Sequence, residues 1–192
     1  MVDLPNFERF VAVDWSGAES PAKSGAIAMA ECRAGSSCVN IINEVKSRRD
    51  VAEMVAHYLK QESRILIGID CNFGYARAIG EKQFGKGYTY RDLWLAVDES
   101  SHNLPDFYAK GFWKNPVYAQ YFWTGGKQNG FELRRRQTEQ RCGALGYGFP
   151  ESPFKMIGPK QVGKGGLAGM RFAHYIKEKY IKSMIDNVHE YG

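Results

Sequence analysis

Apolar residues in the first quarter of the chain are spaced as in β-strands, with turn-forming residues between the runs. Residues 9–15 are apolar on both faces, and the stretches 25–32 and 38–45 predict two further strands, with a turn at 33–37 between them. Strands joined by such short connections pair with their neighbours along the chain. The pattern therefore predicts an antiparallel meander of three strands.

The spacing then changes to that of a helix. Between residues 47 and 63, one helical face collects apolar side chains, and Ser47 with Asp50, or Asp50 with Glu53, supplies a capping pair. The next run, 64–70 (RILIGID), predicts a strand buried on both faces, as inside a partly parallel sheet. A right-handed helical crossover makes this fourth strand parallel to the first, so the predicted fold is α/β with a mixed central sheet and flanking helices.

Each of these two strands ends in an aspartate followed by small and polar residues. Asp14 precedes WSG, and Asp70 precedes CNFG. If the fourth strand lies beside the first, both carboxylates lie at the carboxyl ends of adjacent parallel strands, where open α/β sheets build their sites. Neighbouring carboxylates repel unless a cation lies between them, and Mg²⁺ or Mn²⁺ prefers such oxygen ligands. The alternative is that each aspartate caps the loop after its own strand.

Composition limits the class of protein. A chain of 192 residues that is 44% apolar can bury one good core, so we expect one domain over residues 1–192. No stretch approaches the roughly 20 apolar residues that cross a bilayer, and the start lacks the pattern of a secretory signal. We therefore expect a cytoplasmic protein with no membrane partner. The four cysteines show no C-x-x-C pairing, which argues against zinc and disulfides, although a Cys32 to Cys38 link stays open.

The net charge of +5 is spread unevenly along the chain. Residues 1–70 contain 8 Lys and Arg against 10 Asp and Glu, so residues 71–192 carry all of the positive excess. A basic surface suits phosphate-rich partners such as nucleic acid, whereas a moderately basic protein is more often just soluble. Charge alone leaves both interpretations open.

The strand and aspartate pattern resembles a known fold family. The meander, the helix and the fourth strand, with Asp14 in VAVDWSGA and Asp70 in IGIDCNFG, look like the ribonuclease H-like fold, and most of all like the DUF429-type group of predicted nucleases. The segments RRRQTEQ at 134–140 and GPKQVGKGGLAGM at 158–170 are also similar to that group. The resemblance implies a one- or two-metal phosphodiesterase site with Asp14 and Asp70 as ligands and a further acid from elsewhere.

The position of that further acid departs from the pattern of the family. Ribonuclease H-like nucleases usually carry a carboxylate near the start of a late helix, but the late helix expected here, at about 167–186, has no acid in its first two turns. Glu139 is the better candidate for a third ligand. It lies in a predicted helix at 131–146, four residues after Arg135, and Arg134, Arg135 or Arg136 could bind a phosphate with its guanidinium. The alternative is a solvated basic face with an ordinary i, i+4 pair.

A glycine-rich segment partly matches a phosphate-binding loop. Gly158, Gly163 and Lys164 satisfy G-x-x-x-x-G-K, but Gly165 stands where a P-loop needs Ser or Thr for magnesium. A working nucleoside triphosphatase site is therefore disfavoured. Because an apolar FKMI run precedes this segment and a helix follows it, phosphate binding at the helix start through Lys160 or Lys164 stays open, beside the commoner interpretation as a strand-to-helix turn.

Aromatic residues gather in the middle of the chain. Between residues 107 and 123 eight aromatic side chains are interleaved with Lys110 and Lys114, inside a predicted insertion at about 80–130. They could stack on unpaired bases, but aromatic residues more often fill a core or an oligomer interface, which is the interpretation we favour.

Three functions are consistent with these observations. The first is a Mg²⁺- or Mn²⁺-dependent nuclease or phosphodiesterase in which Asp14, Asp70 and Glu139 hold metal and Arg135 holds phosphate. The second is a nucleotide-binding phosphotransferase of the actin and sugar-kinase type, which normally needs two such domains. The third is a noncatalytic binding or assembly module that kept the fold and lost the last acid.

Overall fold

The computed structural model describes residues 6–61, 64–125, 135–148, 150–158 and 162–181. The chain divides into two compact units, which are described separately: unit 1 comprises residues 1–70 and 175–192, and unit 2 comprises residues 71–174. Within the described ranges, no helix is long and apolar enough to cross a membrane.

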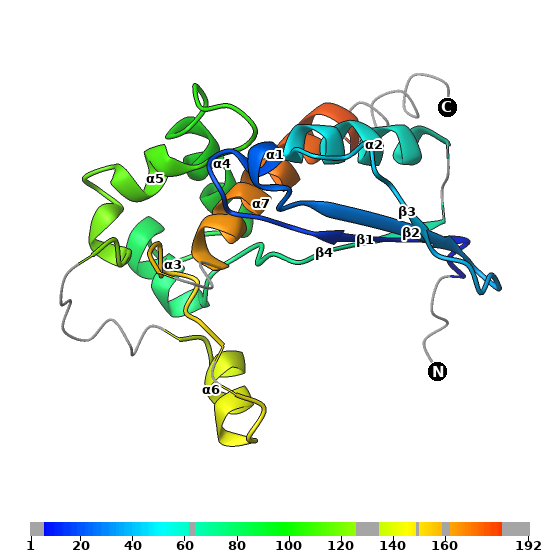
Figure 1. The fold of residues 1–192 in the computed structure, drawn as a ribbon. Coiled ribbons are helices and arrows are strands. Elements are labelled where there is room, and N and C mark those ends of the chain that lie inside the picture. The colour runs from blue at the N-terminus through cyan, green and yellow to red at the C-terminus, as the bar shows by residue number, and fades with distance from the viewer. Residues whose placement is uncertain (1–5, 62–63, 126–134, 149, 159–161, 182–192) are drawn as a thin grey trace. The chain divides into compact units, whose positions relative to one another are not determined.

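Unit 1 is built on one four-stranded mixed sheet. Its elements are β1 (Arg9–Asp14), α1 (Pro21–Ser24), β2 (Ala28–Arg33), β3 (Asn40–Ile41), α2 (Arg48–Gln61) and β4 (Ile65–Ile69). The strand order is β3-β2-β1-β4, with β1 antiparallel to β2 and parallel to β4. The predicted meander, helical crossover and parallel fourth strand beside the first are therefore confirmed, and α2 lies over one face of the sheet (Figure 1).

The alternation of side chains explains why the sheet has one covered face. Along β1, Val11 and Val13 are buried while Phe10, Ala12 and Asp14 are exposed. The buried side of the sheet faces α2, whose Val51 and Val55 are also buried. The open face carries mostly small or apolar residues and ends at Asp14.

The start of α2 follows the predicted capping pattern. Asp50 accepts hydrogen bonds from the backbone N–H groups of Lys46 (2.9 Å) and Ser47 (2.8 Å), and the Ser47 hydroxyl accepts one from the Asp50 N–H (3.1 Å). These bonds satisfy N–H groups that a helix start would leave unpaired, and they lower the pKa of the Asp50 carboxyl against the opposing effect of burial. Ser47 with Asp50 is thus the capping pair.

A polar cluster links α2 to the sheet. Tyr58 donates a hydrogen bond of 2.7 Å to Glu31, which also pairs with Arg9, and the Arg9 guanidinium lies 4.8 Å from the centre of the Tyr58 ring. The hydrogen bond from Tyr58, followed by the Arg9 partner, lowers the pKa of Glu31. Burial and the bond to Glu31 raise the pKa of Tyr58 to about 12.

We expect Tyr58→Phe to lower the free energy of unfolding by about 1–2 kcal/mol at neutral pH, because the charged Glu31 carboxylate loses the hydrogen bond that Tyr58 donates. Glu31 contributes stability above its unfolded pKa, and that stability is lost as pH falls below about 4.5. Tyr58 contributes stability below its unfolded pKa, and that stability is lost as pH rises from 10 to about 12. The free energy of unfolding, measured with urea from pH 3 to 12, should therefore change less with pH at both ends of this range in the variant than in the wild type. Tyr147→Phe, at an 80% exposed residue, is the control; an equal loss there would contradict the role of the cluster.

Unit 2 is helical in its described residues. Its elements are α3 (Arg77–Phe84), α4 (Tyr90–Glu99), α5 (Lys110–Lys114), the 3-10 helix η1 (Ala119–Tyr121) and α6 (Gln137–Ala144). The helix α7 (Val162–Ile176) begins in unit 2 and ends in unit 1, and the π-helix η2 (Lys177–Ile181) belongs to unit 1. The core collects apolar residues of α4, α5 and α7 with aromatic residues between them. Phe112 and Phe122 are fully buried and Trp113 nearly so, which confirms the core interpretation of the aromatic segment.

Several elements differ from their predicted bounds. The third strand has only two residues, because Val39 and Ile41 lie at the sheet edge with 65% and 62% of their surface exposed. The late helix begins at Val162 rather than near 167, and the described part of the predicted helix at 131–146 is limited to α6. The FKMI run forms one isolated bridge, between Lys155 and Trp123, because Phe154 and Met156 enter the core of unit 2 instead.

Candidate functional site

Asp14 and Asp70 occupy neighbouring positions in unit 1. Asp14 is the last residue of β1, and Asp70 directly follows β4. Val13 and Ile69 are register partners, and the Asp70 N–H donates to the Val13 carbonyl at 2.9 Å. Both aspartates are exposed and alternate onto the open face of the sheet. The structure thus brings the two carboxylates to adjacent strand ends, as the strand order predicts.

Other residues stabilise the loops after the two aspartates. After β1, the Ser16 hydroxyl accepts a bond from the Ala18 N–H (3.1 Å), and the buried Arg48 donates to the carbonyls of Ser16 (2.6 Å) and Ala18 (3.0 Å). After β4, the Asn72 side chain donates to the Gly74 carbonyl (3.2 Å). Within the described part of the chain, neither aspartate side chain accepts a hydrogen bond from its loop, so the capping alternative receives no support there.

Two exposed carboxylates suit a hard divalent cation. Mg²⁺ is commonly held by one or two carboxylates while it keeps several water ligands, and such a site stays open to phosphate oxygens. The described residues contain no group of three or more His, Cys, Asp or Glu side chains arranged to hold a metal. The carboxylates of Asp14 and Asp70 on the sheet fit an open two-carboxylate site.

Glu139 has a partner of its own in unit 2. It lies at the third position of α6, is 4% exposed, and accepts hydrogen bonds from the Arg136 backbone N–H (2.5 Å) and the Arg136 Nε (2.6 Å). The carboxylate thereby caps α6 and neutralises Arg136, which is its i, i+3 neighbour; the predicted i, i+4 partner Arg135 instead donates to the Pro150 carbonyl (3.3 Å). A role for Glu139 as a metal ligand stays a prediction, and it would require Glu139 to release Arg136.

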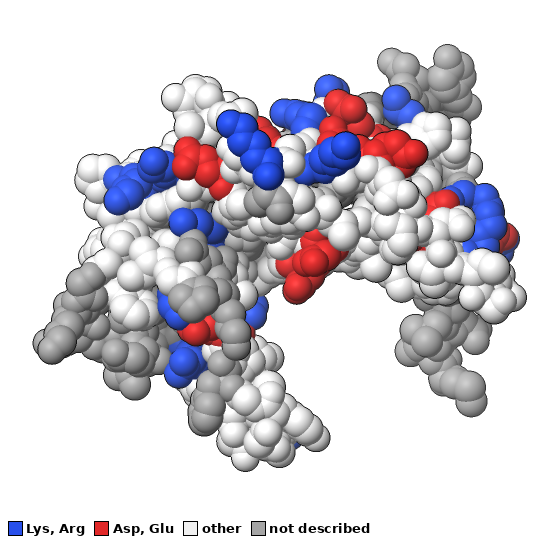
Figure 2. Space-filling model, viewed as in Figure 1, with Lys and Arg blue, Asp and Glu red and all other residues white. Residues whose placement is uncertain are grey.

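The other predicted phosphate-binding residues are only partly described. Arg134 and Lys160 lie outside the described residues. Lys164 is in the first turn of α7, with its amino group 5.9 Å from the centre of the Trp113 ring. In the face drawn in Figure 2, Lys and Arg side chains are interspersed with Asp and Glu and form no continuous basic patch among the described residues.

Two glycines that follow the partial match to a phosphate-binding loop have a packing role in α7. A Cβ atom added at Gly166 would lie 1.9 Å from the Asn72 side-chain oxygen, and one added at Gly169 would lie 2.3 Å from the Cys71 sulfur. These two positions, three residues apart on one helix face, let α7 approach the segment that follows Asp70. The glycine-rich pattern therefore reflects close packing between a helix and a loop.

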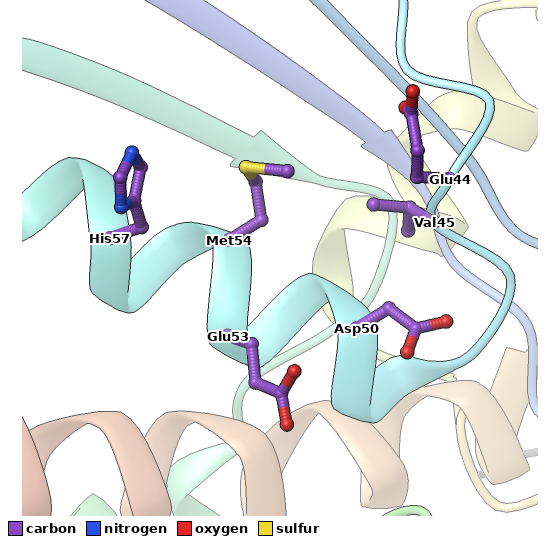
Figure 3. Close-up of a pocket in the computed structure, with 6 residues that line it drawn as sticks. All are labelled: Glu44, Val45, Asp50, Glu53, Met54 and His57. Atoms are coloured by element: carbon purple, nitrogen blue, oxygen red, sulfur yellow. The ribbon is translucent and has the colours of Figure 1, made fainter.

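Sequence reasoning did not identify a shallow pocket in unit 1. It has a volume of about 400 Å³ and lies between α2 and the segment before it (Figure 3), lined by Glu44, Val45, Asp50, Glu53, Met54 and His57. Its carboxylates differ in availability, since Asp50 is engaged in capping α2. The spacing of Asp50, Glu53 and His57 along one helix face was the available signal.

Comparisons with protein-family models, with curated proteins and with solved structures found no match for this chain.

Proposed function

We propose that this protein is a Mg²⁺- or Mn²⁺-dependent phosphodiesterase or nuclease of the ribonuclease H-like class, with Asp14 and Asp70 as metal ligands. The observation that carries the proposal is the placement of two exposed carboxylates at the ends of adjacent parallel strands. Paired carboxylates without a cation repel each other, and a structural cap would have engaged them with backbone N–H groups.

The strand order supports the fold class in this proposal. A three-strand meander followed by a helix and by a fourth strand parallel to the first is the arrangement on which the ribonuclease H-like resemblance rests. Asp14 and Asp70 hold the same positions in that arrangement as the motif aspartates of the resemblance.

The chain itself supplies binding and positioning. When bound, a divalent ion would supply a water of lowered pKa and a positive charge for the phosphate oxygens of a substrate. Asp14 and Asp70 hold that charge at the strand ends. Arg48 fixes the carbonyls of the loop after Asp14, which limits the positions that Asp14 can adopt. Arg135 as the phosphate-binding residue and Glu139 as the third acid stay predictions from the sequence, and both lie in unit 2.

Calorimetric titration with Mn²⁺ and Mg²⁺ tests the metal site. We expect the wild type to bind the ions, and Asp14→Asn to bind them at least about 10-fold more weakly. Removing a metal ligand should lower the affinity at least as much as removing a residue that hydrogen-bonds to a ligand. The variant should unfold at the same denaturant concentration as the wild type. Glu19→Gln removes an exposed carboxylate from the loop after β1 and should change affinity less than about 2-fold.

Hydrolysis assays with Mn²⁺ on single-stranded, hybrid and branched nucleic acids and on a small phosphodiester then test the reaction. Activity that is lost in Asp14→Asn and retained in Glu19→Gln supports the proposal. Wild-type protein that binds neither ion, even with nucleic acid present, contradicts it.

A noncatalytic binding module is the second candidate. The bond between Glu139 and Arg136 favours it, because the acid best placed in the sequence to complete a catalytic set is already neutralised. Metal binding that depends on Asp14, without hydrolysis of any of these substrates, would favour this candidate over the nuclease.

A further inference from the structure

β4 forms one edge of the sheet in unit 1. In the order β3-β2-β1-β4, β4 has a neighbour on one side only, and in the described residues no strand lies beyond it (Figure 1). An edge strand presents unpaired N–H and C=O groups, and proteins usually protect it with Lys, Pro or a bulge. The strand Ile-Leu-Ile-Gly-Ile contains neither Lys nor Pro, and its Leu66 is 47% exposed.

Hydrogen bonds to β1 determine which backbone groups face outward. The Asp70 N–H donates to Val13, and the Arg64 carbonyl accepts from Arg9. In a parallel ladder alternate residues point to the same neighbour, so the even-numbered residues of β4 bond to β1. Ile65, Ile67 and Ile69 therefore direct their N–H and C=O groups away from the sheet.

We infer that a second copy of this chain pairs with this edge, β4 against β4, antiparallel about a twofold axis through Ile67. This register alone pairs all three outward-facing residues: Ile67 with Ile67 of the partner copy, and Ile65 with the partner copy's Ile69 in both directions. The twofold axis is perpendicular to the sheet, so the open faces of the two copies lie on the same side and form one continuous sheet.

Side chains on the open face fit the same register. Leu66 falls opposite the Gly68 of the second copy, and a Cβ atom added at Gly68 meets no atom nearer than the Val11 carbonyl at 3.9 Å. The missing side chain leaves space for the exposed Leu66. Residues in such non-hydrogen-bonded pairs approach more closely than those in hydrogen-bonded pairs, which makes this packing favourable.

Charge is complementary at both ends of the paired strands. One position beyond β4 on each side, the register sets Arg64 opposite the Asp70 of the second copy and Asp70 opposite its Arg64. Arg64 is half-exposed and has Glu8 as its partner within the chain, an exposed pair of little energetic value. The second copy thus contributes a guanidinium next to the Asp14 and Asp70 site, where two neighbouring carboxylates need positive charge.

Sedimentation velocity at protein concentrations from about 1 µM to about 300 µM measures the mass of the species in solution. This wide range is needed because two paired strands of five residues form a small interface, so dimerisation should depend on concentration. We expect the wild type to reach twice its 21.7 kDa. Leu66→Lys should weaken dimerisation at least about 10-fold, and Arg64→Glu should do the same because it places like charges opposite each other. Ile41→Lys, at an exposed apolar residue on the opposite edge of the sheet, should leave the dimer unchanged.

The double charge exchange Arg64→Glu with Asp70→Arg restores opposite charges in this register and should recover the dimer. A wild type that stays monomeric at every concentration overturns the inference. A dimer that persists in both Leu66→Lys and Arg64→Glu also overturns it, because the contact then lies elsewhere.

Amide hydrogen exchange gives a readout at individual residues. The Leu66 and Gly68 amides bond to β1 and should be protected at all concentrations, whereas protection of Ile67 and Ile69 should rise with protein concentration. Protection of Ile67 and Ile69 that does not depend on concentration means that a segment of the same chain covers this edge, and it overturns the inference. Metal binding is no part of these measurements, so the dimer and the proposed function can fail independently.

Discussion

Arg48→Met is expected to lower the free energy of unfolding of unit 1 by about 2–4 kcal/mol, because two partly buried carbonyl groups lose their charged donor. Arg48 is 0% exposed, and its guanidinium donates to Ser16 (2.6 Å) and Ala18 (3.0 Å), the residues that follow Asp14. Urea unfolding measures the loss. Because the same bonds position the loop after Asp14, Mn²⁺ affinity should fall in conditions where the variant is still folded.

The neighbouring arginine provides the matched control. Arg49 is exposed, with its guanidinium 4.9 Å from the centre of the Tyr175 ring, so Arg49→Met should cost less than about 1 kcal/mol. Arg48→Lys keeps a positive charge, but its shorter side chain lacks the planar guanidinium whose NH1 group serves both carbonyls, and it should recover only part of the stability. Equal losses at positions 48 and 49 would contradict a specific role for Arg48 in the loop.

The sheet of unit 1 was predictable because its residues combine local signals that agree. Val11 and Val13 alternate with exposed residues, Ser47 and Asp50 indicate a helix start, and the isoleucines of β4 indicate a strand. The predicted burial of β4 on both faces was wrong: Ile65, Ile67 and Ile69 are half-buried, and Leu66 and Gly68 are exposed. The crossover rule limited where β4 could lie, and a position beside β1 was one of the possibilities. The structure has β4 in that position, so the juxtaposition of Asp14 and Asp70, which the sequence predicted only on that condition, is present.

The roles of arginines were not accessible in this way. The adjacent pair Arg48 and Arg49 reads as an exposed basic start of a helix, yet one side chain is fully buried and the other exposed. Likewise, the spacing of Arg135 and Glu139 suggested an ion pair, whereas Glu139 bonds to Arg136 because a carboxylate at the third helical position reaches back to the N-cap. Which long side chain is buried depends on tertiary contacts that periodicity does not encode.

The glycines of α7 show a further limit of sequence reasoning. Helix propensity disfavours a helix that contains Gly163, Gly165, Gly166 and Gly169, and the predicted start near 167 reflects that cost. The helix nevertheless begins at Val162, because Gly166 and Gly169 let it pack directly against Asn72 and Cys71. Tertiary packing therefore overrides a local preference.

Arg171→Met is expected to have the largest effect on unit 2, about 3–5 kcal/mol in the free energy of unfolding, since it removes a buried guanidinium that serves one carboxylate and two carbonyl groups. Arg171 is 5% exposed; its Nε donates to Asp98 (2.8 Å), and its NH1 donates to the carbonyls of Leu104 (3.2 Å) and Tyr108 (2.7 Å). The substitution would leave the buried Tyr108 carbonyl and the partly buried acceptors of Asp98 and Leu104 without this donor. Urea unfolding, followed by the fluorescence of the buried Trp113, measures the loss.

Arg171 bonds to the residues on both sides of a strained turn. Its substitution should therefore loosen this turn in addition to lowering the stability of unit 2. Asp106 and Phe107 both have positive φ values (50° and 56°), a conformation that costs non-glycine residues about 1–3 kcal/mol each. Without Arg171 to hold Leu104 and Tyr108 on either side, that turn should relax, and amide exchange of residues 104–108 should accelerate before the rest of unit 2 opens. Arg77→Met, at an exposed i, i+4 pair with Glu81, should change stability by less than about 0.5 kcal/mol and leave this exchange unaltered. Unchanged exchange in Arg171→Met would show that the turn is held by its own packing, with Phe107 against Phe172, rather than by the guanidinium.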